Sequence, residues 1–473
     1  MTAELVVNLE SPLPASLPVG SATAVYVTGT CFHRSERLAR LAVEVDGIRH
    51  RPAASRMPRP DVYDADPAGF RSGFWATLPI AARERPGTVE LALAVRLAGG
   101  DELHAPLGRI PIVAPEPAPV LAGAGDPGLI AVCMATFEPD IALFRRQVES
   151  LRGQTDDRWL CVISDDRSGP ERWSQLRAVV AGDARFVASR SDERRGFYGN
   201  FERALRLAPA QASLLALCDQ DDVWLPEKLA VLRGALGDAQ MVYSDQRLVD
   251  VEGRVLRETL WDGRRNNHTD IASLLIANTI TGAATLFRRE VADLALPFPD
   301  APGVQFHDHW LGLVALASGN VAYVDRPLYD YVQHRGAVFG EVEDRRIRKG
   351  ILRGGRGAYF LGYVMREVQA QALLMRCGSS MAGAKRRALR RYVAAARSPV
   401  AFAWLALRPL RGLVGRNETL GSEADLVRGI VWRWLVAILA TGARRPGRRP
   451  CDARFPDEAS FQQRRLSRWR ARA

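Results

Sequence analysis

Short apolar runs alternate with polar residues along the first 113 residues of the chain. Alternation with a period of two places one face of a strand in a core, so strands are predicted at 5–8, 24–28, 41–46, 74–78, 89–97 and 109–113. Turn-forming pairs such as Asp46-Gly47 and Pro86-Gly87 separate these runs. The spacing predicts a small all-β domain over residues 1–113, a sandwich or a barrel. The Pro-, Ala- and Gly-rich segment 114–127 is predicted to be a linker.

From Gly128 onward, continuous apolar runs replace the alternating ones. They predict buried strands at 129–134, 159–164, 184–188 and 214–218, and helical periodicity between them predicts helices at 141–151, 171–181 and 200–207. Strands that alternate with helices form a parallel sheet, so residues 128–340 are predicted to be one α/β domain. Ligands of such sheets bind at the carboxyl ends of the strands.

The last part of the chain, residues 341–473, is predicted to be helical and is strongly basic. It contains 29 Lys and Arg against 10 Asp and Glu, whereas the chain as a whole has a net charge of +12. Segments 402–414 and 427–443 mix Trp, Leu and Val with isolated Arg, as amphipathic helices at anionic membrane surfaces do. Packing of these helices on the α/β domain or on another subunit is the alternative.

Composition and termini narrow the class of protein further. Hydrophobic residues make up 47% and charged residues 25%, which is ordinary for a folded globular chain. No uncharged apolar run reaches the roughly 18 residues of a membrane-spanning helix. The N-terminus is acidic and lacks a basic segment, which argues against a secretory signal. The six cysteines form no CxxC pair, so a reducing, cytoplasmic location is expected.

The strongest chemical signal is the segment LLALCDQDDVWLPEKL, residues 214–229. Its apolar strand delivers Asp219, Asp221 and Asp222 to one exposed end. Carboxylates this close raise one another's pKa, and a hard divalent cation such as Mg²⁺ or Mn²⁺ relieves the repulsion and can bridge phosphate oxygens. A solvated turn is the alternative interpretation of such a motif.

Two further strand ends carry candidate residues for binding a nucleotide. Asp165 and Asp166 follow the second strand, where a carboxylate can accept hydrogen bonds from a base or a ribose, or can instead cap a helix or a turn. Thr136 and Phe137 end the first strand, where an aromatic ring can shape a base pocket or simply pack in the core.

Two more segments carry candidate catalytic groups. In QFHDHWLGLVAL, residues 305–316, Asp308 can deprotonate a hydroxyl as a general base or can cap the helix that follows. His334 follows a predicted strand and precedes Gly336 and Gly340, which suit a mobile loop. It can complete a metal site, contact a diphosphate or have only a structural role.

Taken in order, these segments resemble family 2 glycosyltransferases with a GT-A fold, in particular the bacterial rhamnosyltransferase branch. The similarity covers residues 128–340 and rests on IAVCMATFEP, ISDDRSG, GFYGNFERAL, CDQDDVWLPEKL, NTITGAATLFRREV and FHDHWLGLVALASGNVAYVDRPLYDYVQH. Two positions depart from the family pattern. Arg167 gives DDRSG where DDGST is more frequent, and His309 stands where a second aromatic residue is frequent.

The resemblance implies a role for each candidate residue. Asp308 would be the catalytic base, and Asp219, Asp221 and His334 would hold the metal. The donor nucleotide would contact Thr136, Phe137, Asp165, Asp166, Asn200, Asp219, Gln220 and Asp222. The acceptor side would include Gly282, His307, His309 and Trp310.

The implied activity is inverting, metal-dependent transfer of a sugar to a hydroxyl of a cell-surface polysaccharide or a lipid-linked glycan. The expected donor is dTDP-L-rhamnose, and the protein is expected at the inner face of the plasma membrane through residues 341–473. A galactofuranosyl- or other UDP-sugar transferase and a non-catalytic glycan-binding protein are the alternatives. The basic segment lacks a nucleic-acid-binding signature, so no nucleic acid partner is expected. The oligomeric state stays open, as does the task of the all-β domain: acceptor binding, oligomerisation or bracing.

Overall fold

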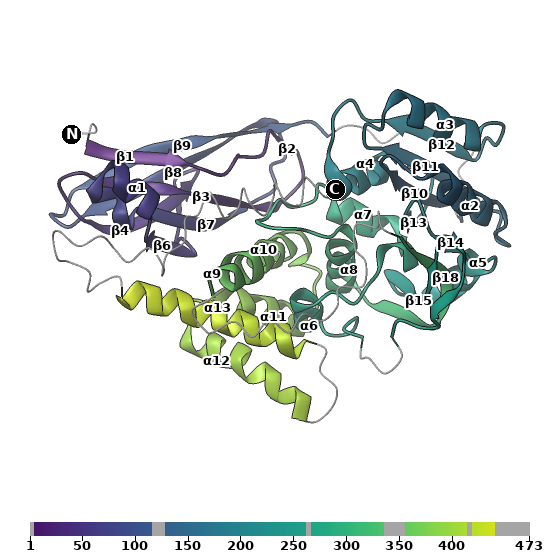
Figure 1. The fold of residues 1–473 in the computed structure, drawn as a ribbon. Helices are drawn as coiled ribbons and strands as arrows, with labels where there is room; N and C mark the ends of the chain where they lie inside the picture. Colours follow the sequence, from purple (N-terminus) through teal and green to yellow (C-terminus); the bar gives the residue numbers. More distant parts are fainter. Residues whose placement is uncertain (1–3, 116–127, 262–265, 335–354, 414–418, 440–473) are drawn as a thin grey trace.

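The computed structural model describes residues 4–115, 128–261, 266–334, 355–413 and 419–439 (Figure 1). Strands β1 to β9 form the first region, the large sheet with its helices forms the second, and the helices from α9 to α13 lie beside both. This arrangement confirms the predicted fold class, a GT-A-like α/β domain between an all-β region and a helical region. The predicted linker falls almost entirely on residues outside the described ranges.

The all-β region consists of two sheets packed face to face. One sheet has the order β1 (Leu5–Leu9), β3 (Thr23–His33), β7 (Gly73–Ile80) and β6 (Ala54–Met57). The other has the order β2 (Leu17–Pro18), β9 (Glu102–Val113), β8 (Gly87–Leu97), β4 (Leu38–Val45) and β5 (Ile48–His50). Helix α1 (Pro60–Ala65) and the short helix η2 (Pro67–Arg71) connect β6 to β7. The region is therefore a sandwich rather than a barrel.

Period-two alternation in β3 and β7 divides their side chains between two cores. Val25, Val27 and Phe74 lie between the two sheets of the sandwich. Ala24 and Trp75 point the other way and join the core of the rest of the molecule. The sandwich is thus apolar on an outer face as well, and that face needs a cover.

The large sheet has the order β12 (Phe186–Arg190), β11 (Trp159–Asp165), β10 (Ile130–Thr136), β13 (Leu214–Cys218), β17 (Thr285–Arg288), β15 (Met241–Asp250), β18 (Val321–Gln333) and β14 (Val223–Trp224). Strand β16 (Val255–Arg257) pairs with β15. The first four strands in this order are parallel. Their carboxyl ends therefore lie at one edge, where the candidate residues follow β10, β11 and β13.

Helices surround this sheet and connect its strands (Figure 1). In chain order they are α2 (Ile141–Arg152), α3 (Pro170–Val180), α4 (Gly196–Leu207), α5 (Lys228–Leu236), α6 (Ile271–Ile276), η3 (Gly282–Ala284), α7 (Arg289–Ala295) and α8 (His307–Ser318).

Two predicted boundaries were wrong for reasons of tertiary structure. Helix α4 begins at Gly196 rather than at residue 200, because the Asp166 carboxylate accepts hydrogen bonds from the backbone N–H groups of Arg195 and Gly196. This replaces a local capping residue, so the sequence around the helix start shows no capping signal. Strand β12 begins two residues later than predicted, because the Asp183 side chain accepts a hydrogen bond from the Arg185 N–H and holds a turn there.

The helical region comprises α9 (Gly355–Gly357), η4 (Ala358–Val364), α10 (Met365–Cys377), α11 (Gly383–Ala394), α12 (Pro399–Leu407), η5 (Arg408–Leu413) and α13 (Leu420–Leu439). The predicted helix at 402–414 is thus two shorter pieces, and the ends of both predicted amphipathic segments lie outside the described residues. Among the residues described, no helix is both long and apolar enough to span a bilayer.

The helical region covers the outer face of the sandwich. Phe360 packs against Trp75, and the Tyr359 hydroxyl donates a hydrogen bond of 2.7 Å to the Ala53 carbonyl. Helix α13 crosses η4 at Gly429, where a Cβ atom would lie 2.6 Å from the Tyr359 backbone nitrogen. Packing, the alternative to membrane contact, therefore describes η4, α10 and α13. Exposed apolar side chains remain on α12, where Val400 is 82% exposed and Leu407 59%, and at the end of α13, where Ile438 is 65% exposed.

Candidate active site

The acidic loop after β13 lies where the sequence predicted it, at the carboxyl edge of the sheet. Strand β13 is buried along its whole length, so Asp219 is the first residue to leave the core. Burial, and then the nearby carboxylates of Asp221 and Asp308, raise the pKa of Asp219 to about 7. Burial and the other two acids of the loop also raise the pKa of Asp222 well above its usual range. The loop thus gathers charges that repel one another.

A buried lysine from the same motif lies beside this loop. Lys228 begins α5, has no exposed surface, and its Nζ donates a hydrogen bond to the Ala283 carbonyl in η3. Its Nζ lies 3.4 Å from the centre of the Trp224 ring and 4.6 Å from that of Tyr329. Burial lowers the pKa of Lys228 to about 7, while Asp222 and Asp219 oppose that shift. Sequence reasoning quoted this lysine within the motif but gave it no role.

His334, at the end of β18, lies against the acidic loop. Its Nε2 is 2.8 Å from Oδ2 of Asp221, and this hydrogen bond raises the pKa of the imidazole. Asp221 and His334, two of the three predicted metal ligands, are therefore in contact. The third, Asp219, lies near enough to Asp221 for that carboxylate to raise its pKa. Within the described ranges, no three acidic, histidine or cysteine side chains already converge as a coordination shell.

The chemistry of the loop suits a divalent cation even so. Both carboxylate oxygens of Asp222 are buried without a close hydrogen-bond partner in the described part of the chain. The Val332 N–H lies near Asp222 and lowers its pKa, but less than burial and the neighbouring acids raise it. Carboxylate oxygens are the preferred ligands of Mg²⁺, and Mn²⁺ accepts carboxylate and imidazole together. The residues present fit such an ion, provided that His334 turns from Asp221 to share it.

The predicted nucleotide-side residues meet at the ends of β10 and β11, but most of them are already bonded within the protein. Asp165 is fully buried and accepts hydrogen bonds from Ser168 N, Ser168 Oγ and Thr136 Oγ1. Asp166 is 1% exposed and is bonded to the Arg194 side chain as well as to the start of α4. Asn200, also buried, joins the backbones of β10 and β11. These residues shape the loops of the site and present little surface to a ligand.

Two other predicted residues, Phe137 and Gln220, do reach the open edge. The Gln220 side chain accepts a hydrogen bond of 2.8 Å from the Phe137 N–H and so joins the loops after β10 and β13. Arg194 lies over the Phe137 ring, with its guanidinium carbon 3.2 Å from the ring centre. Sequence reasoning missed Arg194, since its position depends on its 2.9 Å contact with Asp166.

Asp308 lies in the first turn of α8, across from the acidic loop. The N-cap of α8 is Phe306, so Asp308 is not the capping residue that the alternative interpretation suggested. Its Oδ2 accepts a hydrogen bond of 3.1 Å from Gly282 N, and its Oδ1 accepts one of 3.0 Å from Asn278 Nδ2. Burial raises the pKa of Asp308 to about 6 despite these hydrogen bonds. Asn278 was missed, although it lies in the quoted segment NTITGAATLFRREV.

The absence of a side chain at Gly282 lets its backbone lie close to Asp308 and His307. A Cβ atom there would lie 2.7 Å from Nε2 of His307, closer than real Cβ atoms come. His307 stacks on Phe201 with 3.6 Å between ring centres, and neither of its ring nitrogens has a hydrogen-bond partner within the part of the chain described. Burial lowers the pKa of His307 to about 3, so the ring is neutral. A neutral imidazole with unused nitrogens can bind a hydroxyl.

The other two residues predicted on the acceptor side need correction. Trp310 has no exposed surface, and its Nε1 donates a hydrogen bond of 2.9 Å to the Ala295 carbonyl. His309 is 4% exposed and bonds to the Leu274 carbonyl at 2.7 Å. Both side chains stabilise the core beneath the site, because a helix places residues 309 and 310 on faces other than that of Asp308.

Comparisons with known proteins cover part of the segment that forms this site. Residues 131–294 match the family model described as Glycosyl transferase family 2, a segment that includes the acidic loop but ends before Asp308 and His334. Over 132 residues the chain is 32% identical to an uncharacterized protein of Sinorhizobium fredii, a match that covers 26% of this chain and 14% of that protein.

Two solved structures resemble this one only distantly. TarS of S. aureus, crystallised with UDP-GlcNAc, has a TM-score of 0.41 at 13% identity and covers 66% of this chain and 92% of its own. A mannosyltransferase of Pyrobaculum calidifontis, solved with GDP-Man and Mn²⁺, has a TM-score of 0.37 at 20% identity and covers 67% and 90%. Residues 131–294 are therefore similar to family 2 glycosyltransferases, and they lie within an α/β domain of GT-A-like fold.

Proposed function

We propose that this protein is an inverting, metal-dependent glycosyltransferase that moves a sugar from a nucleotide donor to a hydroxyl of a cell-surface polysaccharide or lipid-linked glycan. One observation carries the proposal: η3 joins the Asp308 carboxylate to the acidic loop, because Gly282 N donates to Asp308 and the Ala283 carbonyl accepts from Lys228 beside the loop. A candidate base and a candidate diphosphate site therefore face each other across a single site. This is the geometry that a direct displacement at a sugar carbon needs.

Asp308 is suited to take a proton from the acceptor hydroxyl. Its pKa of about 6 leaves it ionised at neutral pH, yet more basic than an ordinary carboxylate. The hydrogen bonds from Gly282 N and Asn278 Nδ2 fix its direction. As the hydroxyl oxygen bonds to the anomeric carbon, its proton passes to Asp308 and the bond to the nucleoside diphosphate breaks on the opposite face. The configuration at that carbon inverts.

The divalent ion would be held by Asp219, Asp221 and His334. The buried Asp222 would order the loop. When bound, Mg²⁺ or Mn²⁺ supplies positive charge that stabilises the departing diphosphate. The protein's own part is to keep the carboxylates together, a task in which Lys228 assists by offsetting their repulsion.

The proposed donor is dTDP-L-rhamnose, on the strength of the motif order. Purified protein would be incubated with Mg²⁺ or Mn²⁺ and a panel of dTDP-, UDP- and GDP-sugars, and nucleoside diphosphate release measured with Asp221→Ala as test and the exposed Asp238→Ala as matched control. Release from dTDP-rhamnose that only Asp221→Ala abolishes supports both donor and site. Release from a UDP- or GDP-sugar instead discards rhamnose and keeps the transferase. If no donor is turned over and calorimetry detects no nucleotide binding, the proposed function is wrong.

We also propose that α12 and η5 contact an anionic membrane from the cytoplasmic side. Val400, Leu407 and Leu410 are exposed there, and Arg390 and Arg391 line an adjoining hollow of about 470 Å³ together with Trp404. Neither arginine has an acidic partner in the described ranges. Apolar side chains beside free arginines suit an interface of acyl chains and lipid phosphates. Flotation with phosphatidylglycerol vesicles tests this: Val400→Glu with Leu407→Glu should abolish binding, and equal partitioning of variant and wild type would disprove it.

A further inference from the structure

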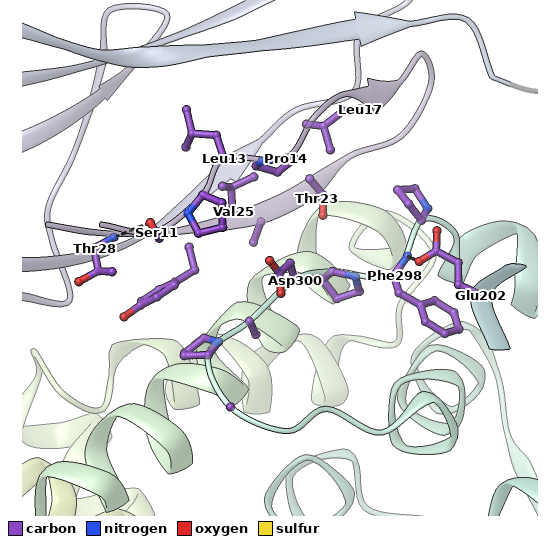
Figure 2. A pocket seen from close by; sticks show the side chains of 18 of the residues that line it. Ser11, Leu13, Pro14, Leu17, Thr23, Val25, Thr28, Glu202, Phe298 and Asp300 are labelled. Atoms are coloured by element: carbon purple, nitrogen blue, oxygen red, sulfur yellow. Dashed lines mark hydrogen bonds between the residues drawn. The ribbon is translucent and has the colours of Figure 1, made fainter. Parts of the chain in front are cut away.

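A cavity of about 940 Å³ lies between the sandwich and the α/β domain (Figure 2). One wall comes from the sandwich, residues 10–14, 16–17, 23–26 and 28, and the other from the loop 297–304 that precedes α8. Glu202 on α4 and Leu361 on η4 complete the lining. The cavity has the size of pockets that bind small organic ligands.

Its lining is acidic and hydroxyl-rich. Asp300, Glu202 and Glu10 supply carboxylates, and Ser11 and Thr23 supply hydroxyls. Among the described residues that line it there is no lysine, arginine or histidine. Glu10 is paired with Arg59 at 2.7 Å and Glu202 with Arg206 at 2.8 Å, whereas Asp300 projects into the cavity in Figure 2 without such a partner in the described chain.

Flat apolar surfaces accompany these polar groups. The ring of Tyr26 lines the cavity, as do those of Pro12 and Pro299 and the side chain of Phe298. Carboxylates and hydroxyls that accept and donate hydrogen bonds, set among ring faces, match the alternating hydroxyls and C–H faces of a sugar. A nucleoside diphosphate or other polyanion would instead meet the Asp300 carboxylate, which no lysine or arginine of the lining offsets.

One arginine fixes both walls of the cavity. Arg376 on α10 donates hydrogen bonds to the Ala22 carbonyl and to Thr23 Oγ1 on the sandwich side, and to the Pro297 carbonyl on the loop side. On the other side of the loop, the Tyr198 hydroxyl donates to the Pro299 carbonyl at 3.2 Å. The cavity is therefore a built site rather than a gap between two loosely joined domains.

The same loop leads directly to the candidate base. Only eight peptide units separate Asp300 from Asp308, so the cavity lies within about 28 Å of the base at full chain extension, and closer along the folded loop. A ligand that extends from the cavity along the loop can reach the reaction site.

We propose that this cavity binds a neutral saccharide segment of the acceptor glycan, remote from the hydroxyl that reacts. That this saccharide belongs to the acceptor rests on the proposed function. The proposal makes glycan binding the task of the sandwich. It also restricts the acceptor: the segment held here bears no phosphate or carboxylate.

The test is binding of the full-length protein to an array of bacterial surface glycans, grouped into neutral glycans and those that bear phosphate or carboxylate groups. We expect wild type to bind one or more neutral glycans, and Asp300→Arg to lose at least about tenfold in affinity, as the loss of hydrogen bonds to a charged group implies. Asp293→Arg, on the exposed side of α7 and outside the cavity, is the matched control and should bind like wild type. Asp300→Asn keeps the shape of the side chain and should give a smaller loss.

The outcomes separate this proposal from the proposed function. Unfolding midpoints of the variants, and their affinity for nucleotide with Mn²⁺, should match wild type, because neither depends on Asp300. Nucleotide turnover without any neutral glycan bound, binding of charged glycans only, or binding that survives in Asp300→Arg each overturns the cavity assignment and leaves the transferase intact. Neutral glycan binding that is lost in Asp300→Arg supports the cavity even if no donor is turned over.

Discussion

Replacement of Lys228 by methionine would test how the acidic loop is held together. Methionine is unbranched and only one heavy atom shorter than lysine, so most of the space beside Trp224 and Tyr329 stays filled while the charge is lost. Two consequences follow from the contacts of Nζ. The Ala283 carbonyl loses its hydrogen bond, and the buried carboxylates of Asp219 and Asp222 lose their nearest cation.

The magnitude follows from burial. An unpaired buried carbonyl costs about 1–3 kcal/mol, and removal of one partner from a buried set of charges costs about 3–5 kcal/mol in all. A loss of about 3 kcal/mol in the free energy of unfolding lowers the midpoint temperature of a domain of this size by about 6–12 °C. We therefore expect Lys228→Met to melt at least about 6 °C below wild type.

Divalent ions should reverse part of this loss. With Lys228 gone, the loop carries one positive charge fewer, so it should bind Mn²⁺ more tightly and gain more stability from it than wild type does. Thermal unfolding with and without Mn²⁺ measures both effects. Lys385→Met is the matched control, because that lysine also donates to two carbonyls, of Leu316 and Gly319, but lies outside the acidic loop.

Two results would refute the reasoning about Lys228. A loss of stability below about 1 kcal/mol would mean that the lysine is not the counter-charge of the loop. An equal gain from Mn²⁺ in wild type, Lys228→Met and Lys385→Met would mean that the ion binds elsewhere.

Further predictions concern the reaction and the donor site. Asp308→Asn should lower kcat by about 10²–10⁴-fold without changing nucleotide affinity, and near wild-type turnover by the folded variant would remove Asp308 as the base. In wild type, kcat/KM should fall about tenfold for each pH unit below the Asp308 pKa of about 6 and level off above it, because only the ionised carboxylate accepts a proton; a flat profile from pH 5 to 8 would contradict this. Arg194→Ala should weaken nucleotide binding in calorimetry, since Arg194 covers Phe137 and neutralises Asp166. An unchanged affinity would mean that the nucleobase of the donor binds elsewhere.

Much of the fold could be predicted because its strands carry strong patterns. The apolar runs of β10, β11 and β13 are continuous, and each is buried on both faces of the sheet. Strands β2, β5 and β6 escaped prediction because two to four residues are too few to show a period. The start of α4 escaped it because its capping group, Asp166, is 30 residues away from Gly196 in the chain.

The site was predictable as a set of motifs but not as a set of contacts. Acidic residues at strand ends indicated where Asp219 and Asp165 would lie, since parallel strands end at one edge. Nothing in the sequence distinguishes an aspartate that is bonded throughout, such as Asp165, from one with unused oxygens, such as Asp222. Trp310 likewise looks like a binding residue in sequence, and only the packing of α8 shows that it belongs to the core.

The seam between the sandwich and the helical region sets a limit on how this protein could be recombined with its relatives. A graft of a different N-terminal unit would most simply cut within 114–127. That cut would leave Phe360 without Trp75, and the Tyr359 hydroxyl without the Ala53 carbonyl. It would also deprive Arg376 of its sandwich partners. A working chimera would have to inherit η4 and α10 together with the sandwich, so the transferable module is discontinuous in sequence.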